Sequence, residues 1–412
     1  MTLLDASGPP TPITVDRPAA AEARLTELDG RTIAYFRVHG VLPGGDGSIE
    51  AEVVLRALML AGQVGCPVVG VVRSVAVDPG PDGVAGLVAW GRVALQATRL
   101  SGTVPLLLAV TGPVHGGLAP LLGLADHVVF TRDATAYING PAPVQAVTGL
   151  RLTADDLGGE RVHRANGLAS LVAADEADAL AAIADLLHVV GDNHLSSPPI
   201  ARSRDPLDRR CIAGPAAVPD NPAHAYDVRT VVTDMLDEGT FLEVHAPRAP
   251  NIVTAYGRIG GRPVAVVANQ PSVRAGTLDI DASTKAARHV QLADSANLPI
   301  LTFVDTPGYE PGRDLEWRGM IRHGAKLVHA YAAASVPRIC VILRKAYGGA
   351  YIVMDSKTMG SDLVLAWPGA EIAVMGAAGA VAILNKGRVD SGLEQEYRAS
   401  FENPYRAAER GD

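Results

Sequence analysis

Aromatic side chains are scarce in this chain and account for only 4% of its 412 residues. Hydrophobic residues still make up 48%, so small and branched aliphatic side chains must fill the cores. The three cysteines, Cys66, Cys211 and Cys340, lie far apart, which excludes a disulfide framework and a zinc ribbon. Cys66 and Cys340 fall in apolar strand candidates and are expected to be core residues. No metal site is predicted.

Long uncharged apolar runs are also missing, because no such run reaches the roughly 18 residues that a membrane span needs. The first 20 residues are rich in proline and lack the apolar region of a secretion signal. An excess of positive charge is absent too, because the formal net charge is −8, which argues against a nucleic-acid surface. These absences predict a cytoplasmic protein that binds neither a membrane nor nucleic acid.

The chain does contain alternating apolar runs of strand length and helix length. Strands are predicted at 32–38, 66–72, 104–110, 127–130, 252–258, 263–268, 298–304 and 336–343. Helices are predicted at 49–64, 83–100, 118–124, 176–190, 283–297 and 315–334, with Ser283 as the N-cap of its helix. Buried strands that alternate with helices predict an α/β fold with parallel strands.

A proline-rich segment divides the chain. Residues 196–227 hold six prolines and little periodicity, which is typical of a linker between domains. We therefore expect a flexible arm at 1–22, an N-terminal domain at 23–195 and a C-terminal domain at 228–412. Two domains agree with the length of the chain.

The two predicted domains share a pattern at a constant spacing. Three pairs lie 232 residues apart, each on the same kind of element: Pro67 and Pro299, Pro105 and Pro337, and Gly116-Gly117 and Gly348-Gly349. Two later segments, 139–144 and 376–381, lie 237 residues apart, which indicates an insertion of about five residues. The spacing indicates a tandem duplication of one strand–helix domain.

Each copy carries one Gly-Gly turn. In the segment Arg344–Tyr351 (RKAYGGAY) the turn follows a buried strand candidate and precedes apolar residues that fit a helix. Backbone N–H groups at a helix N-terminus lack intrahelical acceptors and attract negative charge, such as that of a developing enolate oxygen. An isolated Gly-Gly is more often an ordinary strand-to-helix turn, but the repetition of this turn favours an anion site.

With these residues in view, the chain resembles the carboxyltransferase β subunits of biotin-dependent acyl-CoA carboxylases, such as propionyl-CoA and acetyl-CoA carboxylase. The resemblance is specific from about 226 to 381 and weaker, although continuous in order, from about 26 to 195. The matching segments are VVANQPSVRAGTLDIDASTKAARHV (266–290), TFVDTPGYEPG (302–312), IRHGAKLVHAYA (321–332), RKAYGGAYIVMDSK (344–357) and AWPGAEIAVMGAAGAV (366–381).

The resemblance implies tandem crotonase-like domains, in which ββα units stack as a superhelix. It implies that the N-terminal domain holds the acyl-CoA, that the C-terminal domain holds carboxybiotin, and that active sites are shared between protomers of a homo-oligomer, a dimer or a trimer of dimers. Separate biotin carboxylase and biotin carrier subunits are the implied partners, since the chain has no biotinyl-lysine motif.

The resemblance also implies the roles of individual residues. Backbone N–H groups of Gly116 and Gly117 are expected to bind the thioester enolate, and those of Gly349 and Ala350 the ureido oxygen of biotin. The implied biotin-binding residues are Tyr347, Gly348, Tyr351, Pro307, Gly308, His323 and Gly324. The implied substrate-pocket residues are His115, Ile352 and Lys345.

Two oxyanion holes suit the chemistry of carboxyl transfer. The acceptor must become an enolate, and carboxybiotin leaves a ureido anion when it loses CO2, so two carbonyl-derived oxygens carry charge together. Fixed backbone donors stabilise such charge without reorganising, and one donor typically contributes about 3 kcal/mol. The freed biotin nitrogen can act as the base. A hydratase would instead place acidic residues beside the turn, and residues 116–124 contain none.

The chain departs from the family pattern in its N-terminal half. The family's Asp-Ser-Gly-Gly-Ala-Arg loop is replaced by RSVAVDPG at 73–80, and His115 stands where the family has alanine. We expect an altered acyl-CoA pocket, with His115 either packed on a neighbouring turn or donating to the enolate. The chain also starts closer to its first strand, and stops sooner after its AERG motif, than family members do.

Several side chains have two interpretations. Lys345 and Arg344 fit either a CoA phosphate or substrate carboxylate, or a structural pair, and Ile352 fits either acyl selection or helix packing. Asp305 is expected to stabilise its turn. For the whole chain, the alternatives to acyl-CoA carboxylation are the reverse reaction, as a biotin-dependent decarboxylase or transcarboxylase, and a non-catalytic paralogue that assembles with an active carboxyltransferase.

Overall fold

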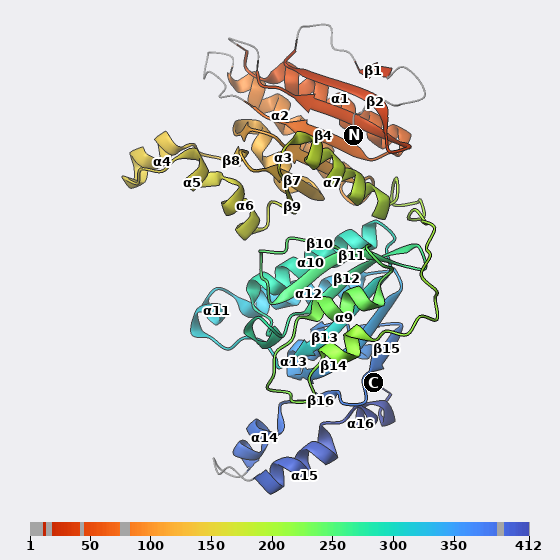
Figure 1. Cartoon of the computed structure of the whole chain (residues 1–412). Helices are drawn as coiled ribbons and strands as arrows, with labels where there is room; N and C mark the ends of the chain where they lie inside the picture. Colours follow the sequence, from red (N-terminus) through yellow and green to blue (C-terminus); the bar gives the residue numbers. More distant parts are fainter. Residues whose placement is uncertain (1–10, 14–18, 42–44, 75–82, 385–390, 412) are drawn as a thin grey trace. The chain divides into compact units, whose positions relative to one another are not determined.

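The computed structural model describes residues 11–13, 19–41, 45–74, 83–384 and 391–411. The chain divides into two compact units, Met1–Pro198 and Pro199–Asp412. Each unit has its own seven-stranded sheet with helices packed against it (Figure 1).

The sheet of the first unit is antiparallel at one edge and parallel elsewhere. Its order is β1 (Thr11–Ile13), β2 (Ala21–Leu28), β3 (Arg31–Val38), β4 (Val68–Val72), β5 (Leu106–Val110), β7 (His127–Thr131) and β9 (Leu171–Ala173). A separate parallel pair is formed by β6 (Pro113–Val114) and β8 (Thr135–Ala136). The helices are α1 (Ser48–Val64), α2 (Gly83–Leu100), α3 (Ala119–Leu124), α4 (Pro141–Thr148), α5 (Ala154–Gly158), α6 (Glu160–Asn166) and α7 (Glu176–Val189).

The second unit repeats this plan. Its strands are β10 (Leu242–Val244), β11 (Ile252–Ile259), β12 (Arg262–Asn269), β13 (Ile300–Thr306), β14 (Arg338–Tyr347) and β15 (Leu363–Ala366), with β16 (Glu371–Ala373) also paired to β14. The helices are α8 (Ala213–Ala217), α9 (Val228–Met235), α10 (Ile280–Ser295), α11 (Arg313–Trp317), α12 (Met320–Ala333), α13 (Gly348–Val353), α14 (Ala377–Leu384), α15 (Ser391–Phe401) and α16 (Pro404–Glu409).

The strand register repeats together with the sequence. Val68 of β4 pairs with Leu106 of β5, and Ile300 of β13 pairs with Arg338 of β14. Both partners are therefore 232 positions later in the second unit, as are the Gly-Gly turns that follow. The duplication predicted from the sequence is confirmed at the level of individual strand pairs.

Aliphatic side chains fill both cores, as the scarcity of aromatic residues requires. Every residue of β4, β5 and β7 is buried, because helices cover parallel strands on both faces. In the second unit, alternate residues of β12 pack with α9, among them Val264, Val266 and Ala268. Cys66 and Cys340 are 4% and 0% exposed, so their prediction as core residues is confirmed.

Two helix predictions are wrong in detail. The N-cap of α10 is Asp279, whose Oδ1 accepts a hydrogen bond from the Ala282 N–H at 2.7 Å, whereas the predicted cap, Ser283, is buried inside the helix. The predicted helix at 315–334 is interrupted between α11 and α12, where Gly319 adopts a φ of 89°. This left-handed backbone ends one helix before the next begins.

The proline-rich segment packs on the second unit. Ala201 donates its N–H to the Gly261 carbonyl at 2.9 Å, and the Arg258 guanidinium donates to the Pro199 carbonyl at 2.9 Å. Farther along, Lys345 Nζ donates to the Pro222 carbonyl at 2.6 Å. These contacts fix 199–222 against the strands of the second sheet.

Candidate active site

The turn of the second unit follows β14 without a loop. Gly348 has a φ of 58°, a left-handed conformation that strains any residue with a side chain. A Cβ there would also lie 3.1 Å from the Val374 carbonyl oxygen. Helix α13 begins at once, so the N–H groups of Gly349 and Ala350 lie in its first turn, where no intrahelical acceptor exists. Two backbone donors are thereby available for an anionic oxygen.

Tyr309 brings together three of the segments that the resemblance implies for biotin binding. A Cβ on Gly324 would lie 3.0 Å from the Tyr309 hydroxyl, and a Cβ on Gly349 would lie 3.6 Å from the Tyr309 ring. Tyr309 itself follows Pro307 and Gly308 in the chain, and its backbone forms an isolated parallel β-bridge with Leu278. Reasoning from the sequence did not single out Tyr309, although it lies in the matching segment 302–312.

The other implied biotin-side residues lie on the elements around this turn. The Tyr347 hydroxyl donates a hydrogen bond to the Glu371 carboxylate on β16, and burial together with Glu371 raises the pKa of this phenol. Tyr351 and Ile352 are on α13, where Ile352 is 48% exposed. His323 precedes Gly324 on α12, and its ring hydrogen-bonds with the Arg322 side chain at 3.2 Å.

Lys345 and Arg344 hold the proline-rich segment in place. Lys345 Nζ donates a hydrogen bond to the Pro222 carbonyl, and burial lowers the pKa of this amine. Arg344 Nη1 donates to the His224 carbonyl at 2.9 Å, while its Nε lies 3.0 Å from Asp305 Oδ2. Of the two interpretations left open for this pair, the structure supports the structural one, and Asp305 has the stabilising position expected of it.

The first unit builds its turn in the same way. Gly116 has a φ of 67°, and a short helical segment begins there and continues into α3. A Cβ on Gly117 would lie 2.5 Å from the Trp90 ring, so only glycine fits beneath this tryptophan of α2. Trp90 is a further neighbour of the site that reasoning from the sequence did not identify.

His115 is the residue just before this turn. Its ring stacks on Tyr137 with 5.9 Å between the ring centroids and 15° between the planes, and burial lowers its pKa. A neutral imidazole packed on a neighbouring ring matches the packing interpretation of His115. Of the altered loop 73–80, Ser74 donates its N–H to the Pro113 carbonyl at 2.6 Å, and 75–80 lie outside the described residues.

Among the described residues, no helix is both long and apolar enough to cross a bilayer. Within the same ranges, no three His, Cys, Asp or Glu side chains gather in a way that would hold a metal ion.

The fold and the two turns define the class of protein. Each unit has the mixed sheet, covering helices and strand-to-helix Gly-Gly turn of a crotonase-like domain, and the chain holds two of them in tandem.

Comparison with known proteins gives the family. A model described as the carboxyl transferase domain matches residues 27–411. The propionyl-CoA carboxylase carboxyltransferase subunit of Haloferax mediterranei is 43% identical over 397 residues, which cover 93% of this chain and 77% of that protein. The methylmalonyl-CoA decarboxylase subunit alpha of Veillonella parvula is 39% identical over 390 residues, which cover 93% and 76%. A solved transcarboxylase 12S structure matches with a TM-score of 0.91 at 37% identity, over 95% of this chain and 78% of that one.

This chain belongs to the carboxyl transferase domain family. It is an enzyme that transfers a carboxyl group, of the kind found in biotin-dependent carboxylases and transcarboxylase.

Proposed function

We propose that the chain transfers a carboxyl group from carboxybiotin on a carrier protein to the α-carbon of an acyl-CoA. The observation that carries the proposal is the pair of equivalent turns. Gly116 and Gly348 both have left-handed backbones, and each opens a helical segment. Two anionic oxygens develop in this reaction, and the chain offers one set of backbone donors for each.

The donor set of the second unit fits the ureido oxygen of biotin. When bound, carboxybiotin supplies the carboxyl group and leaves negative charge on that oxygen. The N–H groups of Gly349 and Ala350 can bind it, and the glycine leaves space beside the ring of Tyr309. Around this turn, Tyr347, Gly348, Tyr351, Pro307, Gly308, His323 and Gly324 are the proposed biotin-binding residues.

The first unit is the proposed acyl-CoA side, with Gly116 and Gly117 as donors to the enolate oxygen. His115 lies beside these donors, and its lowered pKa favours the neutral imidazole. Ile352 is the proposed apolar selector of the acyl group, since it is half-exposed on α13. Lys345 lies next to the turn, but its amine donates to the Pro222 carbonyl, so the role we propose for it is to hold the proline-rich segment.

Propionyl-CoA is the first acceptor to test. Relatives at 43% and 42% identity are carboxyltransferase or beta subunits of propionyl-CoA carboxylase. The reverse direction is the second candidate, because subunits of methylmalonyl-CoA decarboxylase are 39% and 38% identical. Both directions use the same two sets of backbone donors.

The proposed partners are a biotin carboxylase and a biotin carrier subunit. We further propose a homo-oligomer, a dimer or a trimer of dimers. The transcarboxylase 12S structure, which is described as a hexamer assembly, supports this proposal by similarity. A cytoplasmic location stays a prediction from the sequence.

The test is carboxyl transfer by the purified chain. A biotinylated carrier charged with labelled carboxyl groups is mixed with acetyl-, propionyl- or butyryl-CoA, and the labelled acyl-CoA is measured. We expect label on propionyl-CoA, and label moving from methylmalonyl-CoA to the carrier in the reverse assay. No transfer in either direction, together with co-purification with an active carboxyltransferase, would establish the non-catalytic paralogue instead.

A further inference from the structure

Asp355 occupies an unusual position for a carboxylate. It follows the end of α13 by two residues, is 0% exposed, and has a φ of 59°. A glycine would adopt that backbone without strain, and a buried carboxylate is unfavourable unless it is paired. The contacts of its side chain must therefore account for its presence.

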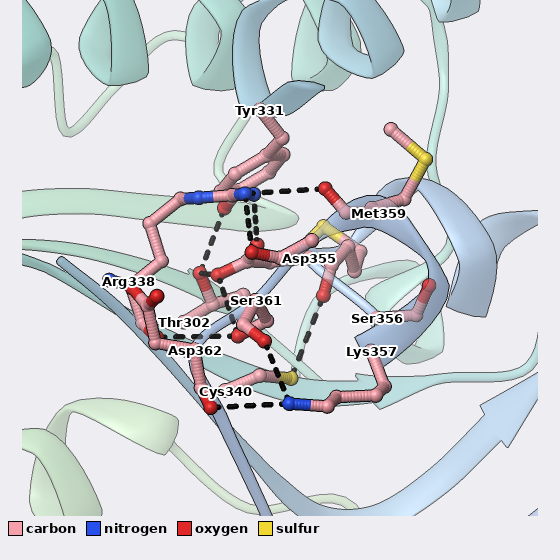
Figure 2. A network of polar contacts seen from close by, with 12 residues as sticks. Thr302, Tyr331, Arg338, Cys340, Asp355, Ser356, Lys357, Met359, Ser361 and Asp362 are labelled. Carbon is pink, nitrogen blue, oxygen red and sulfur yellow. Dashed lines mark hydrogen bonds and ion pairs between the residues drawn. The ribbon is translucent and has the colours of Figure 1, made fainter. Parts of the chain in front are cut away.

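The carboxylate is paired with Arg338 of β14 (Figure 2). Asp355 Oδ1 lies 2.6 Å from Arg338 Nη1, with both side chains almost fully buried. The other arm of the guanidinium, Nη2, donates to the Gly360 carbonyl at 2.7 Å and to the Met359 carbonyl at 3.2 Å. One arginine thus joins β14 to Asp355, the second residue after α13, and to the loop that follows.

Neutral groups from other elements complete the cluster. The hydroxyls of Thr302 on β13 and Ser361 each lie 3.5 Å from Asp355 Oδ2. Thr302 also hydrogen-bonds with the Tyr331 hydroxyl of α12 at 2.9 Å. Groups from β13, β14 and the loop after α13 therefore contact one carboxylate, and α12 joins the cluster through Thr302, as Figure 2 shows.

The first unit makes the same strand pairing without this ion pair. Leu106 stands at the position equivalent to Arg338. A different contact is kept in both units: Asp126 accepts a hydrogen bond from the Leu106 N–H at 2.9 Å, and Asp362 accepts one from the Arg338 N–H at 2.8 Å. The strand therefore forms in the first unit without an arginine at this position. We infer that the Arg338–Asp355 pair has a role specific to the second unit.

We propose that the Asp355–Arg338 pair is a positioning device for the Gly348-Gly349 turn, anchoring the far end of α13 so that its first N–H groups keep their direction. This inference rests on the proposed function of that turn. Helix α13 has only six residues, so its direction is set by its two ends. The left-handed Gly348 fixes one end, and the anchored Asp355 fixes the other.

The charge of Asp355 is sensitive to pH near neutrality. Burial raises the pKa of Asp355 to about 7, against the opposing effect of Arg338. Burial also raises the pKa values of Tyr331 and Cys340, which keeps both neutral. The Lys357 amine faces carbonyl oxygens of the following loop. Protonation of the carboxylate weakens its pairing with Arg338. As the pH falls through 7, the direction of α13 and of its first N–H groups should therefore become less fixed.

The test uses Asp355→Asn in the full chain, with kcat and KM for the charged carrier measured from pH 6 to pH 9. We expect kcat about tenfold lower at pH 8, which is a small misplacement effect, an unchanged KM, and loss of the wild-type inflection near pH 7. Asp294→Asn is the matched control. It removes an exposed carboxylate that accepts the Ser335 N–H at 2.7 Å in the same unit, and it should keep the wild-type profile.

A double variant separates positioning from stability. Arg338→Leu with Asp355→Gly places on β14 the leucine that the first unit has at the equivalent position, and places a glycine at the left-handed position 355. This double variant should be more stable than Asp355→Asn, while its kcat stays low. Wild-type kcat and pH profile in Asp355→Asn, or full activity in the double variant, would overturn the inference.

If the wild-type chain transfers no carboxyl group, the proposed function fails, and amide hydrogen exchange decides the positioning role. Faster exchange at Gly349 and Ala350 in Asp355→Asn supports the role, and unchanged exchange overturns it.

Discussion

Gly117 and Gly349 occupy equivalent places in the two units, but a side chain would meet different neighbours at each. A Cβ on Gly117 would lie 2.5 Å from the Trp90 ring, whereas a Cβ on Gly349 would lie 3.6 Å from the Tyr309 ring. The first distance is a clash and the second is ordinary van der Waals contact. Trp90 therefore leaves no room for a side chain at Gly117, whereas a methyl group fits at Gly349.

Alanine at these two glycines should have different effects on stability. Gly117→Ala forces Trp90 to move and should lower the free energy of unfolding by about 1–3 kcal/mol, the usual range for overpacking. Gly349→Ala adds a helix-favouring residue in ordinary contact with the Tyr309 ring and should change it by less than about 0.5 kcal/mol. Urea unfolding of the two variants measures both values. Equal losses, or a larger loss at Gly349, would contradict the packing described here.

Loss of Arg344 should destabilise the second unit strongly. Burial raises the pKa of Asp305 while Arg344 opposes that rise, so Arg344→Met leaves a buried carboxylate unpaired. The expected loss is about 3–5 kcal/mol, measured by urea unfolding. Asp305→Asn added to Arg344→Met should recover part of it, because no charge is then left buried.

Arg313→Met is the control for this experiment. Arg313 lies over the exposed Trp317 ring at 4.6 Å from its centroid, and its removal should cost less than about 1 kcal/mol. An Arg344→Met variant no less stable than this control would show that the Asp305 pair contributes little.

Acid should destabilise the second unit through the buried His289 and the partly buried His245. Burial lowers the pKa of His289 to about 4 and that of His245 to about 3, below the value near 6.5 of an unfolded chain. The unfolded state then binds more protons, so stability is present above pH 6.5 and is lost as the pH falls from 6.5 to 4.

His289→Phe tests this pH dependence. The ring at this position packs against Tyr256 with 4.8 Å between centroids, and phenylalanine keeps that contact without a proton site. Between pH 7 and pH 4 the variant should lose about 3 kcal/mol less stability than the wild type. Thermal unfolding across this range gives the comparison, and identical pH slopes would show that His289 does not carry the effect.

The repeating elements could be predicted from the sequence because their signals are local. Buried strands such as β4 and β13 are short runs of branched residues, and the constant spacing of the Gly-Gly turns identified both candidate holes. The predicted cap of α10 is wrong because Asp279 and Ser283 are both residue types that cap helices, and the apolar pattern does not distinguish them. The break at Gly319 was missed because the apolar pattern continues across it.

Contacts between distant segments could not be predicted. Trp90 closes the first turn from α2, and Tyr309 lies beside Gly349 from the loop after β13. The Arg338–Asp355 pair forms because β14 and the chain leaving α13 meet at one end of the sheet. Nothing in their spacing indicates these neighbours, which follow from the fold of the whole unit.

The most direct test of this account replaces one proposed donor of the biotin-side turn. Gly349→Pro removes the N–H group of this residue in the first turn of α13. Because proline also disfavours the left-handed backbone of Gly348 before it, the fold of the variant is checked first. Initial rates of labelled carboxyl transfer from a charged biotin carrier to propionyl-CoA are compared with those of the wild type and of Gly349→Ala. We predict an active wild type, a smaller loss of kcat in Gly349→Ala, which keeps the N–H group, and a fall of about 10²–10³-fold in kcat for a folded Gly349→Pro. A folded Gly349→Pro enzyme with wild-type kcat would contradict it.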